Sequence, residues 1–534
     1  MVRLPQQEAR TLLAIHGWSG VLLGMLLYAV IVTGVASVFA DEIGDWSSPL
    51  AEVPAERFPP NSGAALKAFA KTVDPQFYES TFFFPRAGGR LYTFFHRHEQ
   101  DADGEPIERG VHADLDPATG QVIARHEGTG EQIEQLDAPN ALANFFIDMH
   151  VRLHVPDPWG LLLTGMLGLA MMVAAVTGFV IHRHLIKELF TLRRHRQKLL
   201  AMRDIHVVAG TWNLPFAFIL AFTGSFYSFS GSFGIPVMAM IAFGGDQQQA
   251  IEAIVGNPPA GDATPAGIGD IDAMMADARR RAGAEVSFLA VEHWGRADAH
   301  MTLFMMPAEG QLIGTIYTYD GVSGSWLSEK PSLGKVPSAG GTLSALMAPL
   351  HFGNFAGIAS KAVWFALGFA GAYVTFTGML LWTQRRIELP AWRRFGRGVA
   401  WVGYGLPLSL IVVGYAYFPV RAAGGDVNGA MMNLFLVTAA ISGVLAIVLS
   451  PALLRGVLLA TTGVSLAGLP LLRWCSGGPS WPQALASGHL GVIAIDVAVL
   501  LAGALCLAAL RRRRPAPRKA QPSVDATAAG ATQA

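Results

Sequence analysis

The sequence predicts a polytopic, all-α membrane protein with about eight transmembrane helices, two small α+β domains outside the membrane and an internally duplicated plan. Three observations predict this class. Hydrophobic residues make up 52% of the 534 residues and charged residues only 15%, against about 25% charged in soluble domains. The apolar residues gather in charge-free runs. The charged residues gather in the segments between these runs.

Each charge-free run is long enough to cross a bilayer, which takes about 20 apolar residues. The runs cover residues 12–38, 158–182, 205–231, 361–383, 399–420, 430–449, 453–471 and 488–510, and apart from Lys361, Arg455 and Asp496 they hold no charged residue. Pro451 separates two of them, because proline breaks a helix. The first run also resembles a cleaved leader ending at Val38-Phe39-Ala40. We favour a retained helix, because the run exceeds the usual leader core of about 7–15 residues.

The charged segments predict the orientation, since cytoplasmic loops of membrane proteins are rich in Lys and Arg. Residues 183–204 hold seven basic and two acidic residues, and residues 385–397 hold five basic residues and one acidic residue. By contrast, residues 41–157 hold twenty acidic and nine basic residues. We therefore expect a multi-pass protein of a bacterial inner membrane with both termini cytoplasmic and 41–157 and 232–360 in the periplasm.

Charge and cysteine content exclude several function classes. Lys and Arg number 39 and Asp and Glu also 39, so the basic surface that nucleic-acid binding needs is not indicated. The two cysteines, Cys475 and Cys506, cannot build a disulfide framework, a four-cysteine metal site or a C-x-x-C-H haem attachment. Any metal chemistry must therefore depend on histidine.

Histidines and Thr-Gly pairs recur at matched spacings. His16 precedes Thr33-Gly34 and His206 precedes Thr223-Gly224 by 17 residues, whereas His150 precedes Thr177-Gly178 by 27 and His351 precedes Thr377-Gly378 by 26. The external segments match too. Each has a short helical pattern, at 63–73 and 271–283, and then a D-x-x-[TS]-G turn, at 116–120 and 320–324, that indicates a β-hairpin. The first 385 residues are therefore predicted to hold two copies of one helix–domain–helix unit.

Several segments resemble those of a known family. They are HGWSG in the first run, MHVRLHV before the second, HRHLIKELFTLRR after it, RDIHVVAGTWNLPF opening the third and PLHFGNFAG before the fourth. The chain resembles, over about residues 1–390, bacterial inner-membrane proteins with PepSY-type external domains and PepSY-associated transmembrane helices. The resemblance implies PepSY-like α+β domains. Some members are siderophore-iron reductases that look like two-haem electron conduits. The four later helices lie outside the resemblance.

The predicted organisation follows from the runs and the resemblance. We expect helix 1 in 1–40, a first periplasmic domain in 41–157, helices 2 and 3 in 158–231, a second periplasmic domain in 232–360, helix 4 in 361–385, four further helices in 386–510 and a disordered basic cytoplasmic tail in 511–534.

The four matched histidines are candidate haem ligands. A b-type haem that only transfers electrons takes two axial ligands from opposite sides of the iron, and histidines on facing helices supply both. His16 and His206 lie near the cytoplasmic ends of two predicted helices, and His150 and His351 near the external ends. We expect two haems b, one held by each pair. A histidine at the end of a span is otherwise typical of the wetted interface, but four matched ones favour ligation.

Small residues are expected to make room for the macrocycle. Gly20 and Gly24 follow His16, and Gly210 follows His206, at helical spacing, so a flat group could lie on that face. The alternative interpretation is ordinary helix packing on glycine.

Two other histidines compete for ligation. His154 follows His150 by one helical turn, and His182 ends the second run. The matched spacing favours His150 over His154, and His182 is also typical of a basic interfacial anchor.

Three further residues are candidates for substrate or proton binding. His96 and His98 fall on one face of a predicted strand, where they could bind a metal ion or iron chelate or simply face solvent. Asp496 is a carboxylate within a predicted span, about two turns after His489. Such a residue is a candidate proton or quinol-linked group, or a polar tie between helices.

These observations together predict an oxidoreductase. We expect a haem-containing protein that passes electrons from a cytoplasmic or quinol donor to the outside. The resemblance implies that the acceptor is a ferric siderophore or other ferric chelate and that the reaction serves iron uptake. No nucleotide-binding motif is present in the sequence, so NAD(P)H or flavin would require a partner. The alternative is a haem-free PepSY-type protein that binds or regulates a periplasmic protein. A transporter is a third possibility, although its repeats would be parallel.

Overall fold

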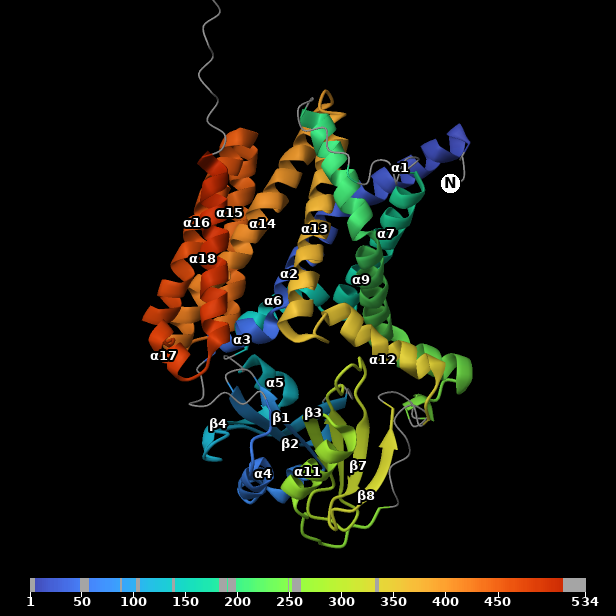
Figure 1. Ribbon diagram of the computed structural model, residues 1–534, viewed down its shortest axis with the longest axis vertical. Helices are drawn as coiled ribbons and strands as arrows, with labels where there is room; N and C mark the ends of the chain where they lie inside the picture. Colours follow the sequence, from blue (N-terminus) through green and yellow to red (C-terminus); the bar gives the residue numbers. More distant parts are fainter. Residues whose placement is uncertain are drawn as a thin grey trace, which may run out of the picture.

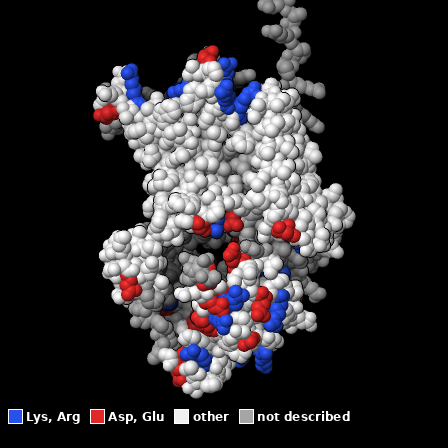
Figure 2. Space-filling view, turned by 180° about the vertical axis from the view of Figure 1, so that it is seen from behind, with Lys and Arg blue, Asp and Glu red and all other residues white. Residues whose placement is uncertain are grey.

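The computed structural model describes residues 5–48, 57–86, 89–101, 106–136, 140–181, 190, 198–247, 249–251, 261–331 and 336–511. The chain forms a helical part and, on one side of it, a part built on a β-sheet (Figure 1). Figure 2 shows a broad band of the helical part without charged side chains, and a hollow between this part and the sheet part. The uncharged band is the surface that a bilayer would cover.

The long helices occur where the charge-free runs predict them. They are α1 (Gln6–Leu22), α2 (Gly24–Ser37), α7 (Trp159–Ile181), α9 (Lys198–Ala242), α13 (Gly357–Gln384), α14 (Pro390–Ala422), α15 (Val427–Val448), α16 (Pro451–Cys475) and α18 (Leu490–Arg511). Among the described residues, seven helices are long and apolar enough to cross a membrane, and the bent pair of α1 and α2 makes an eighth if it is one span. The predicted multi-pass membrane protein is confirmed at this level.

The first run is not one straight helix. α1 and α2 meet at Leu23 with a bend of 66°. Gly24 opens α2 at this point, and a Cβ on it would lie 2.9 Å from Sδ of Met379 in α13. Ser and Gly residues accompany sharp helix bends, and here the missing side chain lets α2 approach α13 closely.

The last helices pack beside the first ones as a separate group (Figure 1). α14, α15, α16 and α18 enclose the fully buried Val413, Tyr417, Phe418 and Met431. The short helices α3 (Ala40–Ser47), α6 (Ala141–Val151) and α17 (Trp481–Ala486) border this group, and Trp46 and Phe145 belong to the same core. Hydrophobic contacts therefore join the later helices to the earlier part of the chain.

The strands form one sheet instead of two separate ones. The strands are β1 (Ser80–Arg86), β2 (Arg90–Gln100), β3 (Pro106–Leu115), β4 (Val122–Thr129), β5 (Val286–Glu292), β6 (His300–Met305), β7 (Ile316–Asp320) and β8 (Trp326–Lys330). Their order is β4-β3-β2-β1-β5-β6-β7-β8, with all pairs antiparallel. β1 pairs with β5 in the middle. Two separate domains would each expose an edge strand there, and pairing satisfies both edges.

Both predicted hairpin turns are confirmed. Oδ1 of Asp116 accepts hydrogen bonds from the backbone N–H groups of Ala118 (3.0 Å) and Thr119 (2.8 Å), and β3 and β4 flank this turn. Oδ1 of Asp320 does the same between β7 and β8. Gly120 and Gly324 close the turns at φ values of 69° and 73°, which glycine adopts without strain.

The core of the sheet part lies against two helices, α4 (Ser62–Ala70) and α11 (Ile271–Ala282). These helices also contact each other. Asp272 at the start of α11 accepts hydrogen bonds from the backbone N–H groups of Gly63 (2.9 Å) and Ala64 (3.0 Å) at the start of α4. A carboxylate at a helix N-terminus stabilises that helix. The two external segments therefore support each other as one folded unit. The remaining helices are η1 (Pro75–Phe77), α5 (Gly130–Gln135) and α12 (Ala339–Phe352).

Candidate cofactor site

The four matched histidines meet in the two predicted pairs. The rings of His16 on α1 and His206 on α9 have centroids 6.4 Å apart with an interplanar angle of 71°. The rings of His150 on α6 and His351 on α12 have centroids 6.0 Å apart with an angle of 31°. Two imidazoles bound through nitrogen to opposite sides of one metal ion, at about 2 Å each, have centres about 6 Å apart. Both separations match that requirement.

Hydrogen bonds at Nδ1 orient each ring of the first pair. Nδ1 of His16 lies 2.9 Å from the carbonyl oxygen of Ala174 in α7, and Nδ1 of His206 lies 3.0 Å from that of Val374 in α13. A carbonyl oxygen only accepts, so Nδ1–H is the donor in each ring. The neutral ring then keeps its lone pair on Nε2, the nitrogen that a metal ion would use.

The second pair is oriented in the same way. Nδ1 of His150 donates to the carbonyl oxygen of Val30 in α2 at 2.8 Å. Nδ1 of His351 lies 2.8 Å from Oγ1 of Thr223 in α9. That hydroxyl donates its own proton to the carbonyl of Ile219 at 2.8 Å, so it accepts from the histidine. Nε2 is again left outside these bonds.

The Thr-Gly pairs lie against the histidine rings. A Cβ added at the glycine would approach Cε1 of the facing ring to 3.0 Å for Gly178 and His16, 3.0 Å for Gly378 and His206, 3.2 Å for Gly224 and His351, and 2.7 Å for Gly34 and His150. Any side chain there would displace the imidazole. The absence of a side chain at each glycine therefore leaves the space that the histidine ring of another helix occupies. The recurrence of Thr-Gly in the sequence did not lead us to predict that these glycines contact the histidine rings. The matched spacing is the sequence feature that could have indicated it.

Of the three glycines expected beside the histidines, two lie against side chains of α13. A Cβ on Gly20 would meet nothing within 4 Å, as a free face requires. Gly24 instead lies beyond the bend and against Met379, and Gly210 faces Cγ1 of Val374 at 3.6 Å. The bend at Leu23 separates Gly24 from the helix of His16, and Val374 of α13 lies beside Gly210. The expected room for a macrocycle stays a prediction.

His154, one of the two competing histidines, takes no part in these pairs. His154 lies in the turn after α6 at φ 53°, and its ring packs on Phe145 with centroids 4.5 Å apart. His182 lies outside the described residues.

Asp496 ties helices together within the apolar region. Oδ2 of Asp496 on α18 lies 2.7 Å from Nη2 of Arg473 on α16, with 0% and 2% of the side chains exposed. The indole N–H groups of Trp46 and Trp481 donate to the same carboxylate at 2.7 and 2.8 Å. His489 precedes the first residue of α18 and is buried.

The two strand histidines do lie together. His96 and His98 on β2 meet Glu108 of β3, and their ligand atoms all lie within 4.8 Å of one another. His96 is fully buried, because the rings of Phe82 and Phe94 cover it. His96 therefore does not face solvent, whereas 58% of the His98 side chain is exposed.

Comparison with known proteins identifies the family. The chain is 27% identical over 399 residues to an uncharacterized protein of Pseudomonas aeruginosa. The aligned region covers 70% of this chain and 96% of that protein. Residues 13–385 match the model of the PepSY-associated TM region. This stretch holds all four paired histidines and the eight-stranded sheet. The chain belongs to the PepSY-associated TM region family.

Proposed function

We propose that the protein is a haem-containing electron-transfer protein that passes electrons across the membrane to a ferric chelate. The observation that carries this proposal is the facing of His16 with His206 and of His150 with His351, at ring separations of 6.4 and 6.0 Å. Each pair fits the two axial ligands of one haem b. Bound haem would supply a one-electron carrier at each pair.

The surrounding residues prepare the histidines for ligation. A hydrogen bond from Nδ1–H fixes the tautomer and ring orientation and raises the basicity of Nε2. Ala174, Val374, Val30 and Thr223 accept these four bonds. The rings are thus held in place before any ligand binds, which reduces the entropy lost on binding.

The position of the pairs supports a path through the membrane. α6 and α12, which carry one pair, lie on the side of the helical part that faces the sheet, whereas the N-terminus of α1 lies at the opposite end (Figure 1). In the orientation favoured by the basic loops, a cytoplasmic or quinol donor gives electrons at His16 and His206. One electron per iron reduces the ferric chelate near the sheet, and the ferrous ion then binds hard oxygen donors more weakly.

A visible spectrum of the purified protein tests the proposal. The protein, expressed with sufficient haem and purified in mild detergent, is expected to show a Soret band and, after reduction, α bands. In vesicles with an enclosed reductant, ferrous iron should appear outside in the presence of a ferric chelate. A folded but colourless protein would refute the proposal and favour the haem-free, partner-binding alternative.

Thr223 offers a milder test of the same site. In Thr223→Val the Nδ1–H of His351 loses its acceptor, because valine keeps the shape but not the hydroxyl. We expect affinity for one of the two haems to fall about 10–100-fold, the usual effect of removing such a partner. Thr375→Val is the matched control, since the Thr375 hydroxyl donates to the carbonyl of Gly371 in its own helix at 3.0 Å. Equal haem retention in both variants would contradict the assigned role.

A further inference from the structure

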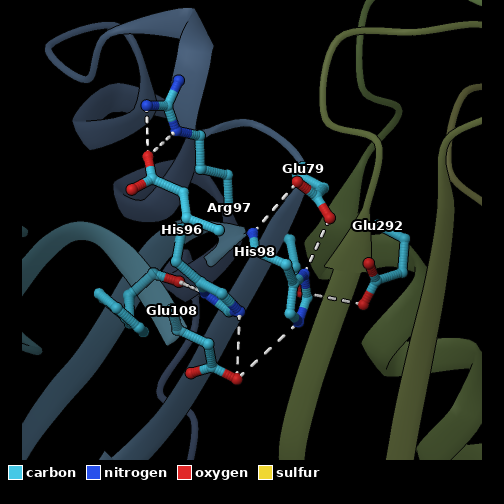
Figure 3. Close-up of polar contacts among 9 residues, drawn as sticks. Glu79, His96, Arg97, His98, Glu108 and Glu292 are labelled. Atoms are coloured by element: carbon cyan, nitrogen blue, oxygen red, sulfur yellow. Dashed lines mark hydrogen bonds and ion pairs between the residues drawn. The ribbon is translucent and has the colours of Figure 1, made fainter. Parts of the chain in front are cut away.

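A cluster of metal-binding side chains lies in the sheet part, apart from the paired histidines. Nε2 of His96 is 4.0 Å and Nε2 of His98 is 3.9 Å from Oε1 of Glu108. The three side chains come from the adjacent strands β2 and β3, and their potential ligand atoms converge on one point (Figure 3). Two imidazoles and one carboxylate form a ligand set typical of divalent first-row transition metals.

Each histidine of the cluster is oriented so that Nε2 faces the common point. Nδ1 of His98 donates to Oε1 of Glu79 at 2.8 Å, and Oε2 of Glu79 accepts from the backbone N–H of the same histidine at 3.2 Å (Figure 3). Nδ1 of His96 bonds the carbonyl of Phe94 at 3.3 Å. A carboxylate or carbonyl behind a histidine is the usual outer support of a metal ligand.

His96 gives the strongest evidence for a bound metal ion. Its side chain is 0% exposed, yet its Nε2 has no hydrogen-bond partner among the described residues. An unpartnered buried polar atom is unfavourable, and a bound ion would supply its missing partner.

We propose that His96, His98 and Glu108 bind a divalent transition-metal ion. In a tetrahedral site with bonds of about 2.0–2.1 Å, ligand atoms lie about 3.4 Å apart. The two separations between a histidine and Glu108, 4.0 and 3.9 Å, therefore need to close by about 0.6 Å, and no pair of ligand atoms needs to close by more than about 1.4 Å. His98 and Glu108 can make this movement because 58% and 42% of their side chains are exposed. Three protein ligands leave a position for water or a donor atom of a chelate, which suits an exchangeable ion.

Titration of the full-length protein with Co²⁺ tests the site. The protein is purified in detergent without a polyhistidine tag, and d–d absorption of Co²⁺ reports binding. We expect one ion per chain, displaced by Zn²⁺, which binds such ligands more tightly. His98→Ala and Glu108→Gln should abolish this binding, and Glu79→Gln should weaken it about 10–100-fold.

Glu127→Gln is the matched control, because it removes an exposed carboxylate from β4 of the same sheet. This variant should bind Co²⁺ as the wild type does. Haem content should be unchanged in all of these variants, which separates this proposal from the one on the paired histidines. The absence of Co²⁺ binding in the wild type, or equal binding in His98→Ala and Glu108→Gln, would overturn the site.

Discussion

Replacing His351 with alanine is expected to remove about half of the bound haem, since one of two haems loses an axial ligand. His206→Ala should remove a similar amount from the other pair. His351 and His206 each face one partner ring, at 6.0 and 6.4 Å between centroids, and alanine cannot bridge that distance. The haem-to-protein ratio, measured by the pyridine haemochrome method, checks the result.

Combination of the two variants sharpens this test. His206→Ala with His351→Ala should leave almost no haem, whereas His150→Ala with His351→Ala, both from one pair, should still retain about half. His126→Ala is the control, because His126 lies on β4 of the sheet and stacks on His112. Full haem retention in both His150→Ala and His351→Ala would refute the assignment of this pair as haem ligands.

Replacing Asp496 with alanine is expected to have the largest effect on stability. Arg473 would remain buried with 2% of its side chain exposed and its charge partner gone. Removal of one member of a buried ion pair costs about 3–5 kcal/mol. The indole N–H groups of Trp46 and Trp481 would lose their acceptor as well. Thermal unfolding of the protein in detergent should show a clearly lower Tm.

The double variant Arg473→Met with Asp496→Leu separates charge from packing. It removes both charges and fills the space with apolar atoms, so most of the lost stability should return. If the double variant were as unstable as Asp496→Ala, an unpaired charge would not be the cause. Trp46 belongs to α3, so the carboxylate also joins the later helices to the start of the chain.

The apolar runs determined the spanning helices, because crossing a bilayer requires a local stretch of apolar residues that any fold must keep. The Asp116 and Asp320 turns were likewise predictable, since their hydrogen bonds lie within a few residues. The histidine spacing predicted which rings are candidates for pairing. The orientation of the chain and the duplication stay predictions.

Only the tertiary structure decided the contacts between segments far apart in the chain. β1 pairs with β5 across about 200 residues, and Gly178 meets His16 on another helix. Glu108 joins His96 and His98 because β2 and β3 pair in one particular register. Asp496 pairs with Arg473 for a similar reason, because α18 and α16 pack side by side. Sequence patterns report local periodicity, whereas such partners depend on how whole elements pack and which edges and charges must be satisfied.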